Sequence, residues 1–477
     1  MSNKNITRRK VVAGIGLGVA ATAVAGSAAL WSPYVSLIPG RSRARAIASD
    51  PKLPAQADAV VIGGGDTGVA AALCLAERGL SVAICEKGVI GGEASCRSNG
   101  VIESMHLNPA KAQLTLRAKE LWAGLNARIG GDTGYRRTGL LETLQTEEQL
   151  AAATDWVKSV AGQPGLDPRI VRPREVLSLY PDSERECLAV LYQPSEATAE
   201  PRWIAPAIAL GARAKGATIH QQCAVRGIET SAGRVSAVVT ERGIIRTGIA
   251  ILAGGVWSPL FAGNLGLTLP QLYTFASNQS VAPLSAAPLI TGGWGRSSWR
   301  MEPDGGYTVG LFAGITPVGW ETFRFGLRYW PALRHMSEIN IGVGQESWRS
   351  LTLERRWQLD QRTPFEETRI LEPTPRIPVL DQSLREVVGA LPAFKNARVR
   401  ERYAGALCTT PDNMPVISSV GAIPGLLMGT GIYYGLTIAP AAGELLADLA
   451  TGTTPRVDPR PYRYERLIDG TRLTFQP

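Results

Sequence analysis

The chain has little histidine and cysteine, and neither shows a metal-binding pattern. Its 477 residues contain three histidines and six cysteines. The cysteines form no C-x-x-C pair and the histidines do not cluster, whereas protein zinc sites need such spacing. We therefore expect no protein metal site. The periplasm would permit disulfides, but the sequence selects no pairing among Cys74, Cys85, Cys96, Cys187, Cys223 and Cys408.

The chain after residue 48 also carries almost no net positive charge. The formal net charge of +9 at pH 7 comes from 50 basic and 41 acidic residues. Residues 1–48 supply seven Lys or Arg and no acid, which leaves 43 basic against 41 acidic residues after them. No basic run carries interleaved aromatic residues. The sequence therefore excludes nucleic acid as an expected partner.

Long apolar runs are absent after the N-terminus. Residues 7–12 read T-R-R-K-V-V, a twin-arginine motif, and an apolar stretch of 21 residues rich in Gly and Ala runs from Val11 to Trp31. Ala46-Ile47-Ala48 offers small residues for cleavage. We expect residues 1–48 to be a twin-arginine signal outside the fold, with the export machinery as a partner and a periplasmic location. The alternative is an uncleaved membrane anchor, because 21 apolar residues can span a bilayer.

Glycines that follow an apolar strand give the strongest functional signal. Ala59 to Ile62 are all apolar, which predicts a buried parallel strand, and Gly63, Gly65 and Gly68 follow in G-x-G-x-x-G spacing. Gly63 permits a sharp turn, Gly65 lets a pyrophosphate approach the backbone, and Gly68 lets the next helix pack closely. The pattern predicts a dinucleotide site.

The elements after these glycines suit the same kind of site. A helix is predicted from Asp66 to about Arg78, and its free N–H groups and positive dipole end face the diphosphate. A strand over Leu80 to Cys85 then ends in Glu86, which is placed to accept the ribose hydroxyls. The candidate cofactor contacts in this unit therefore also include Asp66, Thr67 and Lys87.

Two further segments are candidates for cofactor contact. Residues 91–100 form a glycine-rich loop of small polar residues, from which we select Ser95, Asn99 and Gly100. Its N–H groups and hydroxyls suit phosphate or flavin, although a plain surface loop has the same composition. A strand predicted at 246–252 ends in Ala253 and Gly254, where an open parallel sheet places ligand contacts.

Helical and extended patterns alternate along the chain, which predicts an α/β protein of α+β character overall. Helices are predicted at 109–128, 147–160 and 206–215, and strands at 218–223, 235–240 and 246–252. About 430 residues after the signal exceed what one core usually holds. We expect a Rossmann-like nucleotide-binding domain interleaved with a mixed-sheet substrate domain. The first comprises residues 55–105, 195–260 and 400–460, and the second comprises residues 106–194 and 261–399.

Residues 290–360 differ in composition from the rest of the chain. They hold six of the eleven tryptophans, interspersed with arginines. Aromatic packing between sheet and helices explains this composition, and so does a substrate pocket walled by aromatics or an interface. The six are Trp294, Trp299, Trp320, Trp330, Trp348 and Trp357.

Taken in order, these segments resemble the D-amino-acid-oxidase-like family of FAD-dependent oxidoreductases, which includes D-amino-acid dehydrogenases, glycine oxidase and sarcosine oxidases. The similarity covers nearly all of the chain after the signal. It rests on V-I-G-G-G-D-T-G with Glu86, and on residues 95–100, 134–141, 223–228, 253–258, 403–417 and 429–440.

The resemblance implies FAD as the cofactor. It places the adenine near Val225 and the pyrimidine end of the flavin near residues 431–437, which makes Gly431, Gly435, Leu436 and Thr437 candidate contacts. It also implies an amino acid or amine as substrate. The chemistry is then hydride transfer from the carbon that bears the nitrogen to flavin N5, followed by hydrolysis of the imine.

One departure from the family bears on the substrate. Amino-acid-handling members often read W-x-G-L-R-P-x-T-P-D, whose arginine clamps the substrate carboxylate, and this chain has Leu407 in that position. Arg300 is our candidate for a replacement cation, although a surface arginine paired with an acid is an equally good interpretation. Tyr433 and Tyr434 are candidate substrate contacts beside the flavin.

Two further departures from the family bear on the electron acceptor and on covalent attachment of the flavin. Sarcosine-oxidase-like members use a lysine near the flavin for oxygen reduction, and this chain has no lysine between Lys215 and Lys395. We therefore expect a dehydrogenase that passes electrons to a quinone or a carrier protein. Cys408 is out of register with the cysteine that links flavin covalently in those relatives, and we expect it to be a packing residue.

Two alternative functions remain open at this stage. The flavin can serve a C–O dehydrogenase of a hydroxy acid or polyol, which the Leu407 departure allows. A catalytically silent flavoprotein that serves as a binding subunit is the other possibility.

Overall fold

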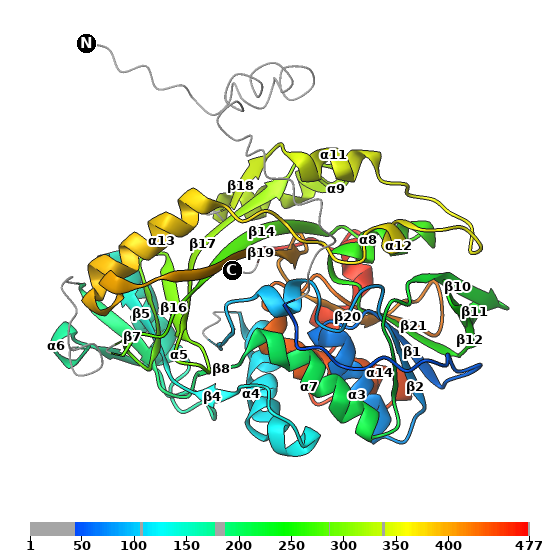
Figure 1. Ribbon diagram of the computed structural model, residues 1–477, viewed down its shortest axis with the longest axis horizontal. Coiled ribbons are helices and arrows are strands. Elements are labelled where there is room, and N and C mark those ends of the chain that lie inside the picture. Colours follow the sequence, from blue (N-terminus) through cyan, green and yellow to red (C-terminus); the bar gives the residue numbers. More distant parts are fainter. Residues whose placement is uncertain (1–42, 105–107, 177–186, 286, 336–338, 476–477) are drawn as a thin grey trace, which may run out of the picture.

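The computed structural model describes residues 43–104, 108–176, 187–285, 287–335 and 339–475. Two large sheets dominate it, one toward the right and one toward the left in Figure 1. The right-hand sheet has six strands in the order β20-β21-β13-β1-β2-β9, and all neighbours are parallel except β20 and β21. These strands are β1 Ala59–Ile62, β2 Val82–Cys85, β9 Thr218–His220, β13 Ile249–Leu252, β20 Val416–Ser419 and β21 Leu426–Thr430.

Four helices pack against one face of the six-stranded sheet and share one apolar core with it. They are α3 Asp66–Glu77, α4 Pro109–Ile129, α7 Pro201–Ala214 and α14 Gly435–Thr451, and Figure 1 shows them together in the lower part of the molecule. Helices α3 and α14 cross closely, because a Cβ at Gly443 would lie 2.5 Å from the Ala70 carbonyl carbon. Trp122 of α4 is buried and its Nε1 donates to the carbonyl of Thr437, at 2.9 Å.

The other face of the six-stranded sheet is covered by a small antiparallel sheet. Its strands are β10 Val225–Ser231, β11 Arg234–Thr240 and β12 Gly243–Arg246. Val225, Val238 and Ile245 share a core with Val60 and Ile62 of β1. The six-stranded sheet is therefore the middle of three layers.

The left-hand sheet has nine strands and is mixed, with β15 parallel to β5, β18 parallel to β17, and the other neighbours antiparallel. The strands are β5 Leu140–Leu144, β6 Arg169–Val171, β7 Ala189–Gln193, β14 Leu272–Val281, β15 Thr291–Trp294, β16 Ser297–Met301, β17 Tyr307–Pro317, β18 Ile339–Gly342 and β19 Val399–Thr409. Helix α13 Ile377–Ala390 packs on it through Val387 and Ala390, against Trp299 and Val309.

Shorter elements connect these layers. A three-stranded sheet joins β3 Val101–Ile102, β8 Ala197–Thr198 and β4 Arg136–Arg137. The remaining α-helices are α5 Glu147–Ser159, α6 Pro173–Val176, α8 Ser258–Asn264, α9 Trp320–Phe325, α10 Trp330–His335, α11 Gln345–Thr352 and α12 Pro364–Glu367. The 3-10 helices are η2 Ala94–Arg97, η3 Gly255–Trp257, η4 Gly326–Tyr329, η5 Pro392–Asn396, η6 Arg460–Tyr462 and η7 Tyr464–Leu467.

The predicted fold class is confirmed, while the structure draws the domain borders differently at two places. Helix α4 lies within the predicted substrate domain, yet its apolar side chains Leu114, Ala118 and Trp122 belong to the core of the six-stranded sheet. Strand β19 begins the last predicted nucleotide segment, yet it pairs with β14 in the nine-stranded sheet. Amphipathic periodicity shows that a helix has a buried face and leaves open which sheet that face meets.

Residues 43–48 pack on the folded body, so the prediction that all of residues 1–48 lie outside the fold is wrong for them. The Arg45 N–H donates to the carbonyl of Arg202 at 2.8 Å, and the carbonyl of Ala48 accepts from Arg213 Nη2 at 2.7 Å. Ile47 packs against the core of the six-stranded sheet. Residues 1–42, which contain the twin-arginine motif, lie outside the described residues.

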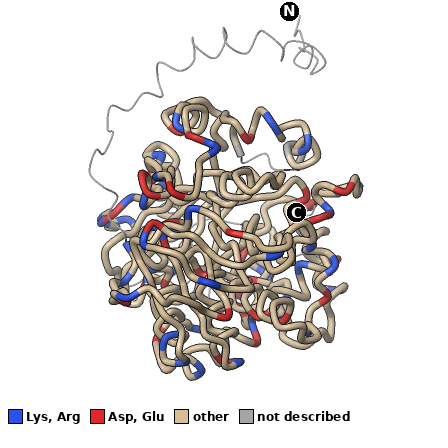
Figure 2. Tube along the Cα trace, turned by 90° about the vertical axis from the view of Figure 1, so that its right-hand side faces the viewer, with Lys and Arg blue, Asp and Glu red and all other residues tan. Residues whose placement is uncertain are grey.

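Charged residues of both signs occur throughout the part of the chain that the structure describes (Figure 2). Figure 2 shows basic and acidic residues interspersed along the trace. No helix among the described residues is long and apolar enough to cross a membrane. Within the same residues, no three His, Cys, Asp or Glu side chains are grouped in a way that could hold a metal ion.

Candidate active site

The turn after β1 depends on glycine for two close approaches. Gly63 has a φ of +109°, and a Cβ there would lie 2.5 Å from the carbonyl oxygen of Ala253. A Cβ at Gly68 would collide with the carbonyl oxygen of Gly63. A Cβ at Gly65 would lie 3.3 Å from Ser95 Oγ. The turn therefore presents bare backbone toward the 91–97 loop.

The N-terminus of α3 carries a buried polar atom that has no protein partner. The Asp66 N–H donates to Ser95 Oγ at 3.0 Å, but Asp66 Oδ1 is buried without a hydrogen bond. Burial raises the pKa of this carboxyl to about 7. A helix N-terminus with bare backbone beside it is a binding place for a polar or anionic group. Thr67 instead packs toward Gly429 of β21.

Glu86 at the end of β2 shapes the next part of the site. Its Oε2 accepts from the Gly64 N–H and its Oε1 from the Gly88 N–H, each at 2.7 Å. Burial raises the pKa of this carboxyl, while the neighbouring Lys87 and the two N–H groups act in the opposite direction. Each carboxylate oxygen has a second lone pair, so the fixed carboxylate can still accept hydroxyl donors.

A cavity of about 140 Å³ lies at the carboxyl ends of β1, β2 and β13. Strand ends of an open parallel sheet are where ligands bind. Of the predicted cofactor contacts, those that line the cavity are Gly63, Gly65, Glu86, Lys87, Ser95, Val225, Ala253 and Gly254.

Lys87 lines this cavity with its stem, while its ammonium group contacts protein. Nζ donates to Glu93 Oε1 at 2.6 Å and to the carbonyls of Thr368 and Arg369 at 2.8 and 2.9 Å. Glu93 also accepts from Trp257 Nε1 at 3.0 Å. Lys87 and Glu93 thus close one side of the cavity rather than leaving a cation exposed in it.

Aromatic side chains that the sequence analysis did not select form the apolar wall near Val225. Trp257 and Phe365 meet edge to face with ring centroids 5.9 Å apart, and Phe261 and Leu371 complete this wall. Such a wall suits a flat apolar ring. Phe365 and Leu371 come from the segment before α13, where no sequence pattern indicated a site.

Arg97 is a further residue that the sequence analysis missed. It follows the cavity-lining residues Ala94 and Ser95 in η2, and only 2% of its surface is exposed. Nη1 donates to the carbonyl of Glu93 at 2.8 Å, whereas Nε and Nη2 have no hydrogen bond, and the nearest acid is Glu372 at 3.7 Å. A buried guanidinium with unused donors is a binding group for an acceptor-rich ligand.

The predicted contacts at the C-terminal turn lie at the rim of the cavity and do not line it. The carbonyl of Gly255, a cavity residue, accepts from Thr430 Oγ1 at 3.3 Å. Gly431 has a φ of +67°, and a Cβ there would lie 2.6 Å from Thr410 Cγ2. Helix α14 begins at Gly435, Leu436 is in the core, and the Thr437 carbonyl is bound by Trp122.

Tyr433 and Tyr434 line a second, smaller pocket with Lys111. It lies between the start of α4 and the start of α14 and holds only about 20 Å³. The tyrosine rings meet edge to face with centroids 5.0 Å apart, and Lys111 Nζ lies 5.8 Å from the Tyr434 ring centroid. Lys111 is 6% exposed, and burial lowers its pKa to about 8.

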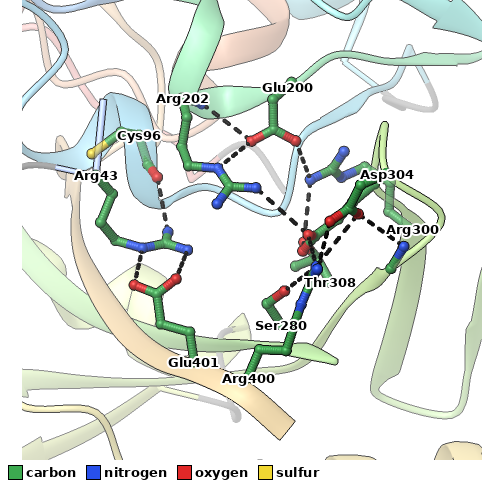
Figure 3. A network of polar contacts seen from close by, with 12 residues as sticks. Arg43, Cys96, Glu200, Arg202, Ser280, Arg300, Asp304, Thr308, Arg400 and Glu401 are labelled. Atoms are coloured by element: carbon green, nitrogen blue, oxygen red, sulfur yellow. Dashed lines mark hydrogen bonds and ion pairs between the residues drawn. The ribbon is translucent and has the colours of Figure 1, made fainter. Parts of the chain in front are cut away.

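Arg300 lies in a buried polar network and not on the surface (Figure 3). Its Nε donates to the carbonyl of Asn99 at 2.6 Å, and Nη2 contacts Thr308 Oγ1 at 3.1 Å and Glu200 Oε2 at 3.4 Å. A Cβ at Gly100 would lie 2.6 Å from Arg300 Nε, so this glycine makes room for the guanidinium. Asn99 itself is exposed. These contacts use the guanidinium to fix the 97–100 loop to β16.

Cys408 lines the large cavity from β19. Burial raises the pKa of its thiol to about 12. A thiol with so high a pKa is a poor nucleophile, because the thiolate is the reactive form. Its surroundings therefore fit the predicted packing role.

Comparison with known proteins gives the same interpretation as the geometry. The chain is 35% identical to L-amino acid deaminase from Proteus myxofaciens, with a TM-score of 0.87 over 90% of this chain and 98% of that one. It is 30% identical to sarcosine oxidase subunit beta from Rhodobacter capsulatus, over 83% of this chain and 86% of that protein. It is 27% identical to glycine oxidase from Pseudomonas aeruginosa, over 84% of this chain and 97% of that protein.

The glycine turn, the unpaired Asp66 oxygen, the Glu86 carboxylate and the cavity between them fit FAD, as the resemblance implied. The family model for FAD-dependent oxidoreductases of the D-amino-acid-oxidase type matches residues 58–449, which include all of these groups. Relatives in this family act on amino acids and amines. The chain therefore belongs to the D-amino-acid-oxidase-like family of FAD-dependent oxidoreductases.

Proposed function

We propose that this chain is an exported FAD-dependent dehydrogenase that oxidises the C–N bond of an amino acid or amine, and that the imine product is then hydrolysed. The observation that carries the proposal is the cavity at the ends of β1, β2 and β13, with its glycine turn and Glu86. The relatives named above are called deaminases or oxidases of amino acids, and this supports a C–N bond as the target.

Different residues of the cavity are assigned to different parts of the cofactor. The turn at Gly63 and Gly65 and the N-terminus of α3 take the diphosphate, and Glu86 takes the ribose hydroxyls. Bound FAD supplies the two-electron acceptor. The N-terminal dipole of α14 stabilises negative charge at the rim where Gly435 begins the helix. The walls made by Trp257, Phe365 and their neighbours exclude water.

The substrate is recognised with little help from a bidentate arginine. Leu407 lies in the position where many relatives carry one, and the Arg300 guanidinium already contacts Asn99, Thr308 and Glu200. The basic side chain among the tyrosines of the smaller pocket is Lys111. We assign Tyr433 and Tyr434 as substrate contacts beside the flavin, with Lys111, whose Nζ lies 5.8 Å from the Tyr434 ring centroid, as the cation nearest to these rings for a substrate carboxylate.

The electron acceptor in this proposal is a quinone or a carrier protein. The gap in lysines between Lys215 and Lys395 supports it, because the oxygen-reducing lysine of sarcosine-oxidase-like members has no counterpart in that range. Export through the twin-arginine pathway is supported by Arg8 and Arg9 before the apolar stretch. That pathway carries folded proteins, which suits a chain that takes up its cofactor before export.

The test is an anaerobic absorbance titration of the purified protein with amino acids of both configurations, secondary amines and hydroxy acids. We expect the oxidised flavin band near ~450 nm to disappear with one class of amine donor. Ammonia or an alkylamine should then be released in proportion to the flavin reduced. Reoxidation should be faster with a quinone analogue than with oxygen.

Three results would count against parts of the proposal. Bleaching by hydroxy acids and not by amines would favour a C–O dehydrogenase. A stable yellow protein that no donor bleaches would favour a catalytically silent binding subunit. A purified chain that takes up no FAD would contradict the assignment of the cavity.

A further inference from the structure

Two glutamates lie opposite each other where the short strands β3 and β8 meet. Ile102 of β3 pairs with Ala197 of β8 in an antiparallel register. The next step of this register brings Glu103 opposite Glu196. Directly opposite residues of an antiparallel pair have their side chains on one face, about 5 Å apart, and like charges there are destabilising. Such a pair of carboxylates is stabilised by a positive group or by protonation.

Glu196 has a positive group beside it, whereas Glu103 has none among the described residues. Glu196 Oε1 lies 3.4 Å from Lys119 Nζ and accepts from the Ser104 N–H at 3.1 Å. Its Oε2 is buried without a hydrogen bond. Burial, with Glu196 and Glu142 beside it, raises the pKa of Glu103 to about 8, and within the described chain no basic side chain acts in the opposite direction.

Glu142 of β5 is the third acid of this group. Its side chain is exposed, yet burial raises its pKa. A carboxyl that is accessible and still loses much of its solvent lies in a hollow of the protein. We name Glu103, Glu142 and Glu196 the acidic cluster. Lys119 pairs with Glu196, while Arg137 nearby is exposed and forms no ion pair within the described residues.

The acidic cluster adjoins the tyrosines that we assign as substrate contacts. The Glu103 N–H donates to Thr437 Oγ1 at 3.4 Å, which fixes this glutamate to the first turn of α14. Burial raises the pKa of the Tyr434 hydroxyl, and Glu103 and Glu142 add to this shift. Carboxylates beside aromatic rings form a favourable environment for an ammonium group, because both the charges and the ring faces attract it.

The kind of cation follows from the chemistry of the site. No three His, Cys, Asp or Glu side chains of the described residues could hold a metal ion together, so an organic cation suits the acidic cluster. The nitrogen next to the oxidised carbon must be uncharged, since its lone pair forms the imine as the hydride leaves. A carboxylate instead favours the charged form of an amine. The acidic cluster therefore suits a second nitrogen that stays protonated.

We propose that the acidic cluster binds a second, positively charged nitrogen of the substrate, so that the electron donor is a basic amino acid or a diamine. The inference rests on the proposed function and narrows its substrate class. It assigns Glu103 and Glu142 to the cation, with Glu196 Oε2 as a further acceptor.

The experiment measures binding by isothermal titration calorimetry of the FAD-loaded protein with two ligands of the same shape. One is (trimethylammonio)butanoate, and the other is its analogue in which a tert-butyl group replaces the trimethylammonium group. Neither has a nitrogen lone pair, so neither can be oxidised to an imine. We expect the cationic ligand to bind at least about tenfold more tightly. Glu103→Gln should reduce this preference about tenfold, and the double variant with Glu142→Gln should abolish it.

Glu229→Gln is the matched control, because Glu229 is exposed on β10 and should leave the preference unchanged. The flavin spectrum and the melting temperature verify the fold of each variant. Equal affinity for the two ligands in the native protein, or a preference that the double variant retains, would overturn the proposal.

A second measurement separates this inference from the proposed function. In the anaerobic flavin titration, lysine should bleach the flavin at lower concentration than norleucine, which has the same chain without the second nitrogen. Glu103→Gln should remove the difference. Bleaching by norleucine at the lower concentration would contradict the cation site and support the proposed function. A preference for the cationic ligand without bleaching by any amine would support the cation site and contradict the proposed function.

Discussion

Arg43 and Glu401 form a bidentate ion pair that joins the first described residue to β19. Arg43 Nε lies 2.6 Å from Glu401 Oε1, and Nη2 lies 2.7 Å from Oε2 (Figure 3). Arg43 Nη1 also donates to the carbonyl of Cys96 at 3.2 Å, and its guanidinium carbon lies 3.5 Å from the Tyr403 ring centroid. One side chain therefore connects the N-terminal segment, the 91–97 loop and the nine-stranded sheet.

Replacing Arg43 should destabilise the 91–97 loop, which lines the cavity. We expect Arg43→Ala to lower the free energy of unfolding by about 1–2 kcal/mol, a modest loss because the Glu401 side chain is 43% exposed. FAD should also dissociate faster, because the 91–97 loop loses the hydrogen bond between Arg43 and the Cys96 carbonyl. Urea unfolding and flavin fluorescence measure the two effects. A chain that begins at Ser49 should show both effects more strongly, and equal FAD retention in that chain would contradict the role of residues 43–48.

The pair also predicts a response to acid. Arg43 lowers the pKa of Glu401 below its usual value of 4.5. Stability from a lowered carboxyl pKa is present above the unfolded-state pKa and is lost as the pH falls through the folded-state pKa. Between pH 5 and pH 3 the native chain should therefore lose stability more steeply than Arg43→Ala. Parallel curves for the two chains over this range of about two pH units would contradict the prediction.

The crossing of α3 and α14 should not tolerate a methyl group. We expect Gly443→Ala to cost about 1–3 kcal/mol, because its Cβ would lie 2.5 Å from the Ala70 carbonyl carbon. FAD affinity should fall as well, since α3 carries Asp66 at its start. Gly124→Ala in α4 is the matched control. A Cβ at Gly124 meets no atom within 4 Å, so alanine should stabilise the helix by up to ~1 kcal/mol.

Lys111 predicts a rise in stability at alkaline pH. Burial lowers its pKa from 10.5 to about 8, so between these values the unfolded chain binds more protons than the folded one. The free energy of unfolding should therefore increase as the pH rises from 8 toward 10.5. Lys111→Met should be more stable than the native chain at pH 7 and should lack this increase. Lys158→Met, at a side chain that is 75% exposed, should behave as the native chain does.

A buried ion pair fixes the turn before the last strands. Arg466 Nε donates to Asp412 Oδ2 at 2.8 Å, and both side chains are less than 8% exposed. Arg466→Ala leaves a buried carboxylate unpaired and should cost about 3–5 kcal/mol. The control is Arg460→Ala, which breaks a pair whose arginine is 86% exposed and should change stability by less than ~1 kcal/mol. Similar losses in both variants would contradict this ranking.

The sequence predicted the local elements of the nucleotide-binding half well. Strand β1 and helix α4 lie within a residue of the predicted bounds, because apolar runs, N-caps and glycines are local signals. Helix α7 begins at Pro201 and not at the predicted residue 206, since Glu200 caps it and Pro201 occupies its first turn. Pro206 lies inside that helix.

The site was predictable only in part, for reasons that lie in tertiary structure. The glycine turn and Glu86 are adjacent in sequence to the strands that place them, so their position followed from the pattern. Arg97 is buried because β19 packs against its loop, with a Cβ at Gly405 only 3.0 Å from Arg97 Cβ. Nothing local in the sequence indicates that contact. Arg300 is likewise held by Glu200, a residue 100 positions away.

The order of strands in the six-stranded sheet has a consequence for the timing of synthesis. Strand β1 lies beside β13, and β13 is hydrogen-bonded to β21, so residues near 60, 250 and 427 are neighbours. Helix α14, which ends at Thr451, completes the core behind α3. Almost the entire chain must therefore be synthesised before the sheet can close. The nascent polypeptide carries its glycine turn for most of translation without the neighbours that would let it hold a nucleotide.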